Sequence, residues 1–504
     1  MMNNNGLLIA YFMLAACSLK AQGQRDSVYH EQFRPQVHFS PKEHWMNDPN
    51  GMVYYKGVYH LFFQYFPGGT TWGPMHWGHT VSKDLVHWKE LPIALYPDSL
   101  GFIFSGSAVA DINNTSGFGK DGKIPLVAIF THHDSKSERA GKDNFQNESL
   151  AYSLDDGNTW TKYDGNPVLK NPGIRDFRDP SVIWFEPQKK WVMTLATKDR
   201  VTFYSSPNLK DWKKESDFGS TLGAHTGVWE CPNLFPLKFE NKIYWVLIGS
   251  VNPGGPNGGS ATQYFIGHFD GTTFTPESNA KTKWIDYGPD DYAGVTWANT
   301  GSRKIFLGWM SNWTYAGQLP TVKWRNAMTI PRDLAVKREN NELYITSNPV
   351  KEFKAIDLKP IKISSGGKDD FSYDGIIPDQ YELNLSFDQT NGCTISLSND
   401  EGDKLEVGFN KATNSYYVDR NKSGLTAFNP EFPKILFAPR LTNAVSSKVT
   451  LLFDSSSLEL FGDDGLSVLS ALFFPRTPFN HLQFHFAKNN KIKNLELVAL
   501  KSIW

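Results

Sequence analysis

The sequence has few cysteines, no excess of charge of either sign, and no long apolar run beyond its first residues. The 504 residues include 3 cysteines, too few for a disulfide framework. The formal net charge is -1 and there is no basic cluster, which argues against nucleic acid as a partner. Because HExxH, CxxC and carboxylate-rich calcium patterns are also missing, we predict neither a metal nor a cofactor.

The apolar run at the N-terminus is typical of an export signal. Residues 6–16 are too few to span a bilayer, and residues 14–17 read LAAC, the pattern of a bacterial lipoprotein cleavage site. We therefore expect residues 1–17 to be a lipoprotein-type signal peptide, Cys17 to be acylated, and the protein to be anchored to a bacterial outer membrane, at the cell surface or on the periplasmic face. Residues 1–5 lack the usual Lys or Arg, and ordinary secretory cleavage near Ala21 is the alternative.

Long helical periodicity is missing as well, and short runs of β-branched and aromatic residues take its place. Such runs occupy residues 59–65, 126–130 and 243–248, each bounded by Gly, Asn, Asp or Pro. Aromatic residues make up 14% of the chain, which suits sugar stacking but equally suits sheet cores, so this figure does not separate the two. We predict an all-β protein.

A loose repeat runs through the first two thirds of the chain. Residues 82–88, 153–160 and 206–212 share a strand, an acidic or polar turn and a closing Trp, and residues 268–274 are a weaker copy. Five polar motif positions recur at intervals of roughly 50 to 75 residues, as expected for four-stranded blades; they are Asp48, Ser105, Asp179, Glu230 and Asp290. We predict a five-bladed β-propeller over residues 35–345 that gathers these positions at one funnel. A stack of sandwiches is the alternative.

The pattern changes near residue 346. We interpret residues 18–34 as an N-terminal linker and residues 346–356 as a second linker. Residues 357–504 continue with alternating strands and lack the acidic-proline motifs found upstream. This pattern predicts a C-terminal β-sandwich that serves as an accessory domain.

Residues 45–51, which read WMNDPNG, hold an acid in a stiff turn. Pro49 fixes its own φ, and the Asn-Gly pair that follows favours a tight turn, so Asp48 would have a fixed place. We expect Trp45, beside this turn, to form the floor of a sugar site. Alone, this segment would be read as an ordinary hairpin turn.

Two further acidic motifs strengthen the case for a catalytic site. In residues 176–180, Arg178 would favour an ionised Asp179 if their side chains approach. Glu230 lies in residues 227–231 among mostly apolar neighbours, which would favour its neutral form. One charged and one neutral carboxyl group are what the cleavage of a glycosidic bond requires. We interpret Cys231 as a buried packing residue and not as a nucleophile.

Together these motifs resemble glycoside hydrolase family 32, the invertase, levanase and inulinase group. The resemblance covers roughly residues 35–500 and is most similar to bacterial levanase or fructanase members. The motifs that carry it, in chain order, are residues 45–51, 63–65, 72–79, 104–107, 177–180, 229–232 and 308–313.

The resemblance implies a five-bladed propeller followed by a sandwich, and retaining cleavage of β-D-fructofuranosidic bonds in fructans (levan or inulin), with sucrose as a further candidate substrate. It implies that Asp48 is the nucleophile, Glu230 the general acid and base, and Asp179 the residue that holds fructose hydroxyls and stabilises the transition state. The positions that match the family's fructose pocket are Asn47, Gln64, Trp72, Phe104, Ser105, Arg178, Asp290, Tyr292 and Trp313.

One motif departs from the pattern of the family. Relatives often carry Asp-Phe-Tyr-Ala where this chain has Asp-Asp-Tyr-Ala, so Asp291 replaces an aromatic residue. We expect this change either to widen and repolarise the rim of the cleft or to be neutral. Three alternatives stay open: a fructosyltransferase using the same residues, a non-catalytic fructan-binding lipoprotein, and an inverting arabinan-type propeller hydrolase.

Overall fold

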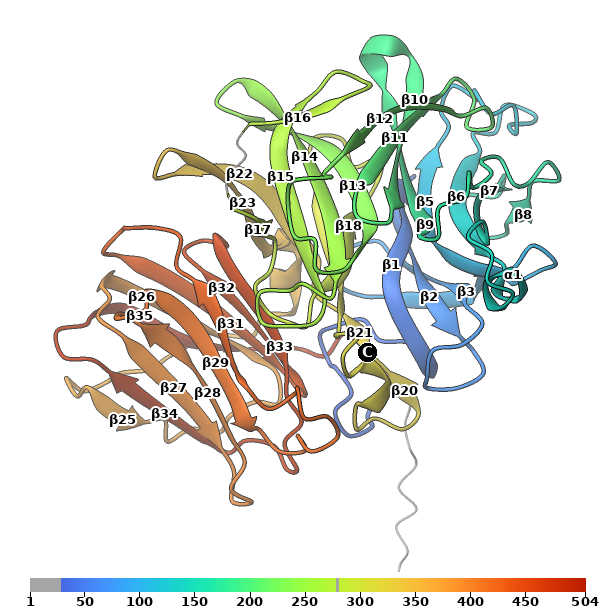
Figure 1. Ribbon diagram of the computed structural model, residues 1–504. Coiled ribbons are helices and arrows are strands. Elements are labelled where there is room, and N and C mark those ends of the chain that lie inside the picture. The colour runs from blue at the N-terminus through green and yellow to red at the C-terminus, as the bar shows by residue number, and fades with distance from the viewer. Residues whose placement is uncertain (1–28, 278–280) are drawn as a thin grey trace, which may run out of the picture.

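The computed structural model describes residues 29–277 and 281–504. Cys17, the predicted signal peptide and most of the predicted N-terminal linker lie outside this range. Five small sheets form a propeller and two larger sheets form a sandwich beside it, which confirms the predicted all-β fold (Figure 1). In the described part of the chain, no helix is long and apolar enough to cross a membrane.

The five blades follow one another along the chain. The first contains β1 (His44–Tyr55), β2 (Val58–Phe66), β3 (His76–Ser82), β4 (Lys89–Leu95) and, from a distant segment, β20 (Trp324–Arg325). The second contains β5 (Phe102–Ala110), β6 (Leu126–His133), β7 (Gln146–Ser153) and β8 (Thr161–Lys162), with the short helix α1 (Ser135–Arg139) between β6 and β7. The third contains β9 (Phe177–Phe185), β10 (Lys190–Thr197), β11 (Val201–Ser206) and β12 (Lys213–Phe218), with η1 (Glu186–Gln188) between β9 and β10.

The last two blades carry extra short strands. The fourth contains β13 (Val228–Phe239), β14 (Lys242–Asn252), β15 (Ala261–Phe269), β16 (Phe274–Pro276) and β17 (Lys283–Trp284). The fifth contains β18 (Tyr292–Thr296), β19 (Ile305–Met310), β21 (Ala327–Met328), β22 (Arg332–Glu339) and β23 (Glu342–Pro349), with η2 (Ala316–Gln318) after β19. The first strand of each blade lies innermost, and β18 contacts β1, so the ring closes. A parallel bridge between Val53 and Ala298 links the first and last blades.

The sequence repeat is the turn that joins the third and fourth strands of a blade. In the first blade the hydroxyl of Ser82 accepts the backbone N–H of Asp84 at 3.1 Å. In the third blade Ser206 accepts the N–H of Asn208 at the same distance, and residues 153–155 repeat the arrangement in the second. Such side-chain bonds to the backbone two residues on are the usual way in which Ser and Asp stabilise a turn. The repeat therefore marks the same internal turn in successive blades.

The sandwich follows the propeller and consists of two six-stranded sheets. One sheet holds β24 (Ile361–Lys362), β35 (Lys491–Ala499), β26 (Tyr381–Gln389), β31 (Ser447–Asp454), β32 (Ser457–Gly462) and β33 (Ser467–Leu472). The other holds β25 (Asp370–Ser372), β34 (His481–Phe486), β27 (Cys393–Ser398), β28 (Lys404–Asn410), β29 (Ser415–Lys422) and β30 (Ile435–Pro439). Alternate residues of both sheets face one apolar core, as the alternating pattern predicts.

The domain limits differ from the predicted ones at both linkers. Strand β23 pairs with β22 through Pro349, so the fifth blade extends past residue 345. The 3-10 helix η3 (Lys351–Ile356) then buries Phe353 and Ile356 instead of forming a free linker. At the N-terminus, Arg34 is 1% exposed and donates to Ser40 at 3.0 Å, so the described end of that linker is packed against the fold.

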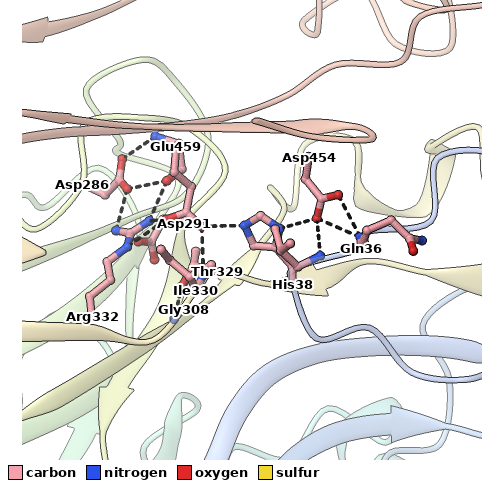
Figure 2. Close-up of polar contacts among 12 residues, drawn as sticks. Gln36, His38, Asp286, Asp291, Gly308, Thr329, Ile330, Arg332, Asp454 and Glu459 are labelled. Atoms are coloured by element: carbon pink, nitrogen blue, oxygen red, sulfur yellow. Dashed lines mark hydrogen bonds and ion pairs between the residues drawn. The ribbon is translucent and has the colours of Figure 1, made fainter. Parts of the chain in front are cut away.

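A buried charge cluster joins the propeller to the sandwich (Figure 2). Arg332 of β22 donates to Asp286 at 2.9 Å and to Asp291 at 3.0 Å in the propeller, and forms an ion pair with Glu459 of the sandwich. His38 bridges Glu459 at 2.8 Å and Asp454 at 2.7 Å. These side chains are almost completely buried, and an apolar core that includes residues of both domains surrounds the contact. We infer that the sandwich holds the propeller in one fixed arrangement.

Candidate active site

Each of the five inner strands breaks its regular pairing at one end of the propeller axis. A β-bulge adds a residue to one strand and turns its side chain out of the regular alternation, and bulges are frequent beside active sites. The register shifts lie between Met46 and Pro49 in β1, Ile103 and Gly106 in β5, Arg178 and Ser181 in β9, Glu230 and Asn233 in β13, and Tyr292 and Val295 in β18. Every predicted catalytic acid lies at such a break.

Three of these breaks also place a non-glycine residue in the left-handed region. The φ angles are 66° for Asp179, 47° for Cys231 and 54° for Ala293. Such conformations cost free energy and persist where the surrounding fold enforces them, often at functional sites. The strained residues sit on three neighbouring blades, which points to one shared site.

Asp48 receives three side-chain donors. Asn47 Nδ2 donates to its Oδ1 at 2.8 Å, and the Ser105 hydroxyl donates to its Oδ2 at 2.8 Å. The Cys231 thiol also contacts Oδ2, at 3.7 Å. Burial and then the nearby charge of Glu230 raise the pKa of Asp48, while the bonds from Asn47 and Ser105 oppose this shift. The carboxyl group is thus held in one orientation in a region of concentrated negative charge.

Trp45 does not have the role that its place in the sequence suggests. It is 1% exposed, so it cannot be the floor of a sugar site. Its indole N–H instead donates to Asn47 Oδ1 at 2.8 Å, which fixes the amide that contacts Asp48. The half-buried Trp313 lies over it, with ring centroids 6.0 Å apart. Trp45 therefore supports the site from below.

Asp179 lies beside Asp48 and shares a neighbour with it. The backbone N–H of Cys231 donates to Asp179 Oδ2 at 3.0 Å, and the thiol of the same residue lies 3.6 Å from that oxygen. Burial and the charge of Glu230 raise the pKa of Asp179, and the attraction of Arg178 is too weak to reverse this. Arg178 lowers the pKa of Asp179, as expected, but burial and the charge of Glu230 outweigh this effect.

Glu230 has polar neighbours, not the apolar ones predicted from its sequence context. Arg178 Nε donates to its Oε1 at 3.0 Å, and the Tyr292 hydroxyl donates to its Oε2. Arg178 also contacts Asp176 at 2.8 Å, so one guanidinium is shared by two acids. Trp229, the apolar residue before Glu230, is instead buried in an apolar cluster.

Cys231 is a residue whose place in the site we did not predict. The thiol is buried and touches both Asp48 and Asp179, although we interpreted it only as a packing residue. Burial, followed by the three neighbouring carboxylates, raises the pKa of the thiol, so it remains a neutral donor. Its position next to Glu230 in an acidic-proline motif is the signal that could have revealed it.

The remaining predicted pocket residues lie on several elements. Trp72 is 44% exposed and meets the ring of Phe104 edge-on at 6.1 Å, and Phe104 stacks on His133 at 4.3 Å. Gln64 is buried on β2, and within the described chain its Nε2 has no hydrogen-bond partner. Exposed rings and an unpaired amide are suitable for binding a sugar.

Asp290 and Asp291 are the two residues that the structure places elsewhere. Asp290 is fully buried and accepts hydrogen bonds from the Tyr315 hydroxyl at 2.6 Å and from Arg420 of the sandwich at 2.7 Å. Asp291 is also buried and pairs with Arg332. The prediction for Asp290 was wrong, because this residue contacts the sandwich and not the other acids. Of the two alternatives for Asp291, a place at the rim of the cleft is contradicted by its burial. Tyr292, which bonds Glu230, is the site residue of this strand.

The chain matches two family models that together span both domains. Residues 38–347 match the Glycosyl hydrolases family 32 N-terminal domain, and residues 350–501 match the Glycosyl hydrolases family 32 C terminal model. The chain belongs to glycosyl hydrolase family 32. It is therefore a glycosidase, as the motifs predicted.

Named relatives and solved structures of this family resemble the whole chain. A levanase of Bacillus subtilis is 45% identical over 99% of this chain and 75% of its own length. An extracellular exo-inulinase of Aspergillus niger is 41% identical over 90% of this chain and 91% of its own length. The crystal structure of an exo-inulinase from Aspergillus awamori superposes with a TM-score of 0.86 at 38% identity, covering 94% of this chain and 100% of that one.

Proposed function

We propose that this protein hydrolyses β-D-fructofuranosidic bonds of fructans, with retention of configuration at the anomeric carbon. The observation that carries the proposal is the meeting of Asp48, Asp179 and Glu230, from three different blades, around one cysteine and one arginine. The names of the relatives, levanase and exo-inulinase, support fructans as the substrate class.

In the first step the glycosidic C–O bond breaks and the anomeric carbon bonds to the carboxylate of Asp48. Glu230 gives its proton to the departing oxygen. In the second step Glu230 takes a proton from water, the water oxygen bonds to the anomeric carbon, and Asp48 leaves as a carboxylate. Atoms and charge balance over the two steps, and both residues return to their starting states.

The contacts of each acid suit its proposed role. Asn47 and Ser105 hold the Asp48 carboxylate in one orientation, which a nucleophile needs. Arg178 and Tyr292 hold Glu230. Asp179 adds negative charge beside the developing oxocarbenium ion and would bind fructose hydroxyls, which favours the transition state.

We propose that Gln64, Trp72, Phe104 and Trp313 shape the pocket for the terminal fructosyl unit. Trp72 is the most exposed of them, and its edge-on contact with Phe104 leaves a ring face available to a sugar. The amide of Gln64 retains an unused donor within the described chain, which a fructose hydroxyl would satisfy.

The proposed reaction is tested with levan, inulin and sucrose as substrates. Proton NMR of the first product should show the β-anomer of fructose before mutarotation, and chromatography of early products distinguishes fructose alone (exo-action) from a ladder of oligomers (endo-action). The Asp48→Asn variant should lose about 10³-fold or more in kcat while keeping its melting temperature. Inversion at the anomeric carbon, or a Asp48→Asn variant with native turnover, would contradict the proposal.

We also propose that the protein is exported and acylated at Cys17, a residue outside the described range. Support comes from the LAAC pattern of residues 14–17, and extracellular relatives support export alone. Expression with a radiolabelled fatty acid should label the native chain and leave the Cys17→Ala variant unlabelled. Equal labelling of both, or of neither, would contradict acylation at this residue.

A further inference from the structure

A buried carboxyl group lies behind the catalytic acids. Glu148 is on β7, where its side chain is fully buried, and its Oε2 accepts the hydroxyl of Thr131 from β6 at 2.7 Å. Its other oxygen has no hydrogen-bond partner in the described chain. Neither residue belongs to one of the acidic motifs of the sequence.

The Thr131 hydroxyl has a second contact, which leads to the active site. Its oxygen accepts the backbone N–H of Asp179 at 3.0 Å. Asp179 has a φ of 66° and lies at the bulge of β9, so its backbone is strained at this point. One hydroxyl thus joins a buried acid to the strained backbone of a catalytic residue.

The surroundings of Glu148 favour its neutral form. No ion pair joins it to a cation among the described residues, and an unpaired buried charge is costly. Burial raises the pKa of Glu148 well above its usual range, the charge of Asp179 adds to the effect, and only the bond from Thr131 opposes it. The charge of Glu148 interacts with Asp179 on β9 and with Tyr204 on β11, and neither group is cationic.

We propose that Glu148, as a neutral carboxylic acid, is a positioning residue that fixes Asp179 through the Thr131 hydroxyl. It touches no substrate. By accepting a hydrogen bond from the Thr131 hydroxyl, Glu148 keeps the oxygen of that hydroxyl oriented toward the backbone N–H of Asp179. The Asp179 carboxylate then stays where the transition state needs it. This inference rests on the proposed role of Asp179 in fructoside cleavage.

The test uses paired substitutions in the full-length chain. Glu148→Gln keeps a neutral group that can accept from Thr131, so it should stay within about twofold of native kcat. Glu148→Ala removes the acceptor, and Thr131→Val removes the hydroxyl while keeping the shape. Each should lower kcat at least about tenfold with little change in KM, because bonds made by Asp179 tighten in the transition state. Thr131→Ser is the matched control and should remain active.

The double variant shows whether Glu148 and Thr131 act on Asp179 together, through one chain of hydrogen bonds, or each in its own way. If both residues act on Asp179 as one unit, Glu148→Ala combined with Thr131→Val should be no slower than the worse single variant. Rates are normalised to the folded fraction, measured by near-UV circular dichroism. If Glu148→Ala does not fold, comparison of Thr131→Val with Thr131→Ser still decides whether the hydroxyl positions Asp179.

Three results would overturn the inference. Glu148→Gln as slow as Glu148→Ala would mean that an ionised carboxylate is needed. Native kcat in Thr131→Val would mean that the hydroxyl does not position Asp179. A multiplicative loss in the double variant would mean that the residues act separately. A native enzyme without activity on any fructan would instead contradict the proposed function, so the two failures are distinguishable.

Discussion

Two clusters of buried charge in this protein contain similar residues but differ in how completely each charge is paired. At the domain interface, Arg332 contacts three acids and His38 contacts two, and both members of the Arg332–Glu459 pair are 0% exposed (Figure 2). In the active site Arg178 contacts Glu230, and these side chains keep 13% and 21% of their exposure. We call the first the sealed cluster, because its charged side chains are closed off from solvent, and the second the open cluster, because its side chains remain partly exposed.

The difference shows what each cluster can do. Sealed charges with full sets of partners hold the sandwich on the propeller, and removing one partner is expensive because the others stay buried. In the open cluster, burial and then the neighbouring charge of Glu230 raise the pKa values of Asp48 and Asp179. Excess negative charge of this kind is stabilised when a positively charged transition state forms. The same types of side chain therefore stabilise the domain interface in one cluster and serve catalysis in the other.

The largest expected effect comes from exchanging the glutamate of each cluster. Glu230→Gln cannot protonate the leaving oxygen, so kcat should fall by about 10²- to 10⁴-fold with an unchanged melting temperature. Glu459→Gln is the matched control and should keep native kcat at 25 °C while melting earlier. Steady-state kinetics and thermal melts on both variants check this. A large loss of kcat in fully folded Glu459→Gln would contradict the assignment of a structural role to Glu459 and a catalytic role to Glu230.

The next effect is on stability. Arg332→Met leaves Asp286, Asp291 and Glu459 without their guanidinium, and we expect a loss of about 3–5 kcal/mol in unfolding free energy. Arg338→Met serves as control because the Arg338–Glu240 pair is 40% and 58% exposed, and exposed pairs contribute little. Urea unfolding measures both. Equal losses in the two variants would contradict the importance of burial.

The sequence allowed the open cluster to be predicted but not the sealed ion pairs between the two domains. Asp48, Asp179 and Glu230 each lie in an acidic-proline motif that is visible locally. Asp290 follows Pro289 and shows a similar local pattern, yet it pairs with Arg420, which lies 130 residues further along the chain. A contact of such range leaves no local sign, so the sequence-based prediction placed Asp290 in the pocket.

Other features escaped prediction for a related reason. The blades, their order and the turn repeat follow from alternation and turn residues, which are local. The bulges at the inner strands shift side chains out of that alternation, so the partners of Glu230 and the place of Cys231 could not be read from it. Glu148 looks like an ordinary strand residue because its partner Thr131 lies on another strand.

A pH series tests the histidine of the sealed cluster. Asp454 and Glu459 outweigh the effect of burial and raise the pKa of His38 from 6.5 to about 9. Protonated His38 therefore stabilises the fold fully below pH 6.5, and this contribution is lost as the pH rises through about 9; it amounts to roughly 3 kcal/mol. His38→Gln should be less stable than the native protein at pH 6, and the difference should shrink by pH 10. A difference independent of pH would contradict this assignment.

The smallest effect concerns one donor of the open cluster. Ser105→Ala removes the hydroxyl that donates to Asp48, and the transition-state barrier should rise by about 1 kcal/mol, roughly fivefold in kcat/KM. Ser153→Ala, in the turn of the same blade, should leave kcat/KM unchanged. Kinetics with sucrose or a short fructan compare the two. Native kcat/KM in Ser105→Ala would show that the hydroxyl does not position the nucleophile.

The most direct measurement compares two aspartates in the same two assays. Asp48→Asn and Asp290→Asn are each assayed for kcat on a fructan and for unfolding free energy in urea. We expect Asp48→Asn to lose nearly all activity and keep its stability, and Asp290→Asn to keep kcat while losing about 3 kcal/mol, because Arg420 loses its buried partner. Activity lost with Asp290→Asn at full folding, or retained with Asp48→Asn, would contradict the division between open catalytic acids and sealed structural ion pairs.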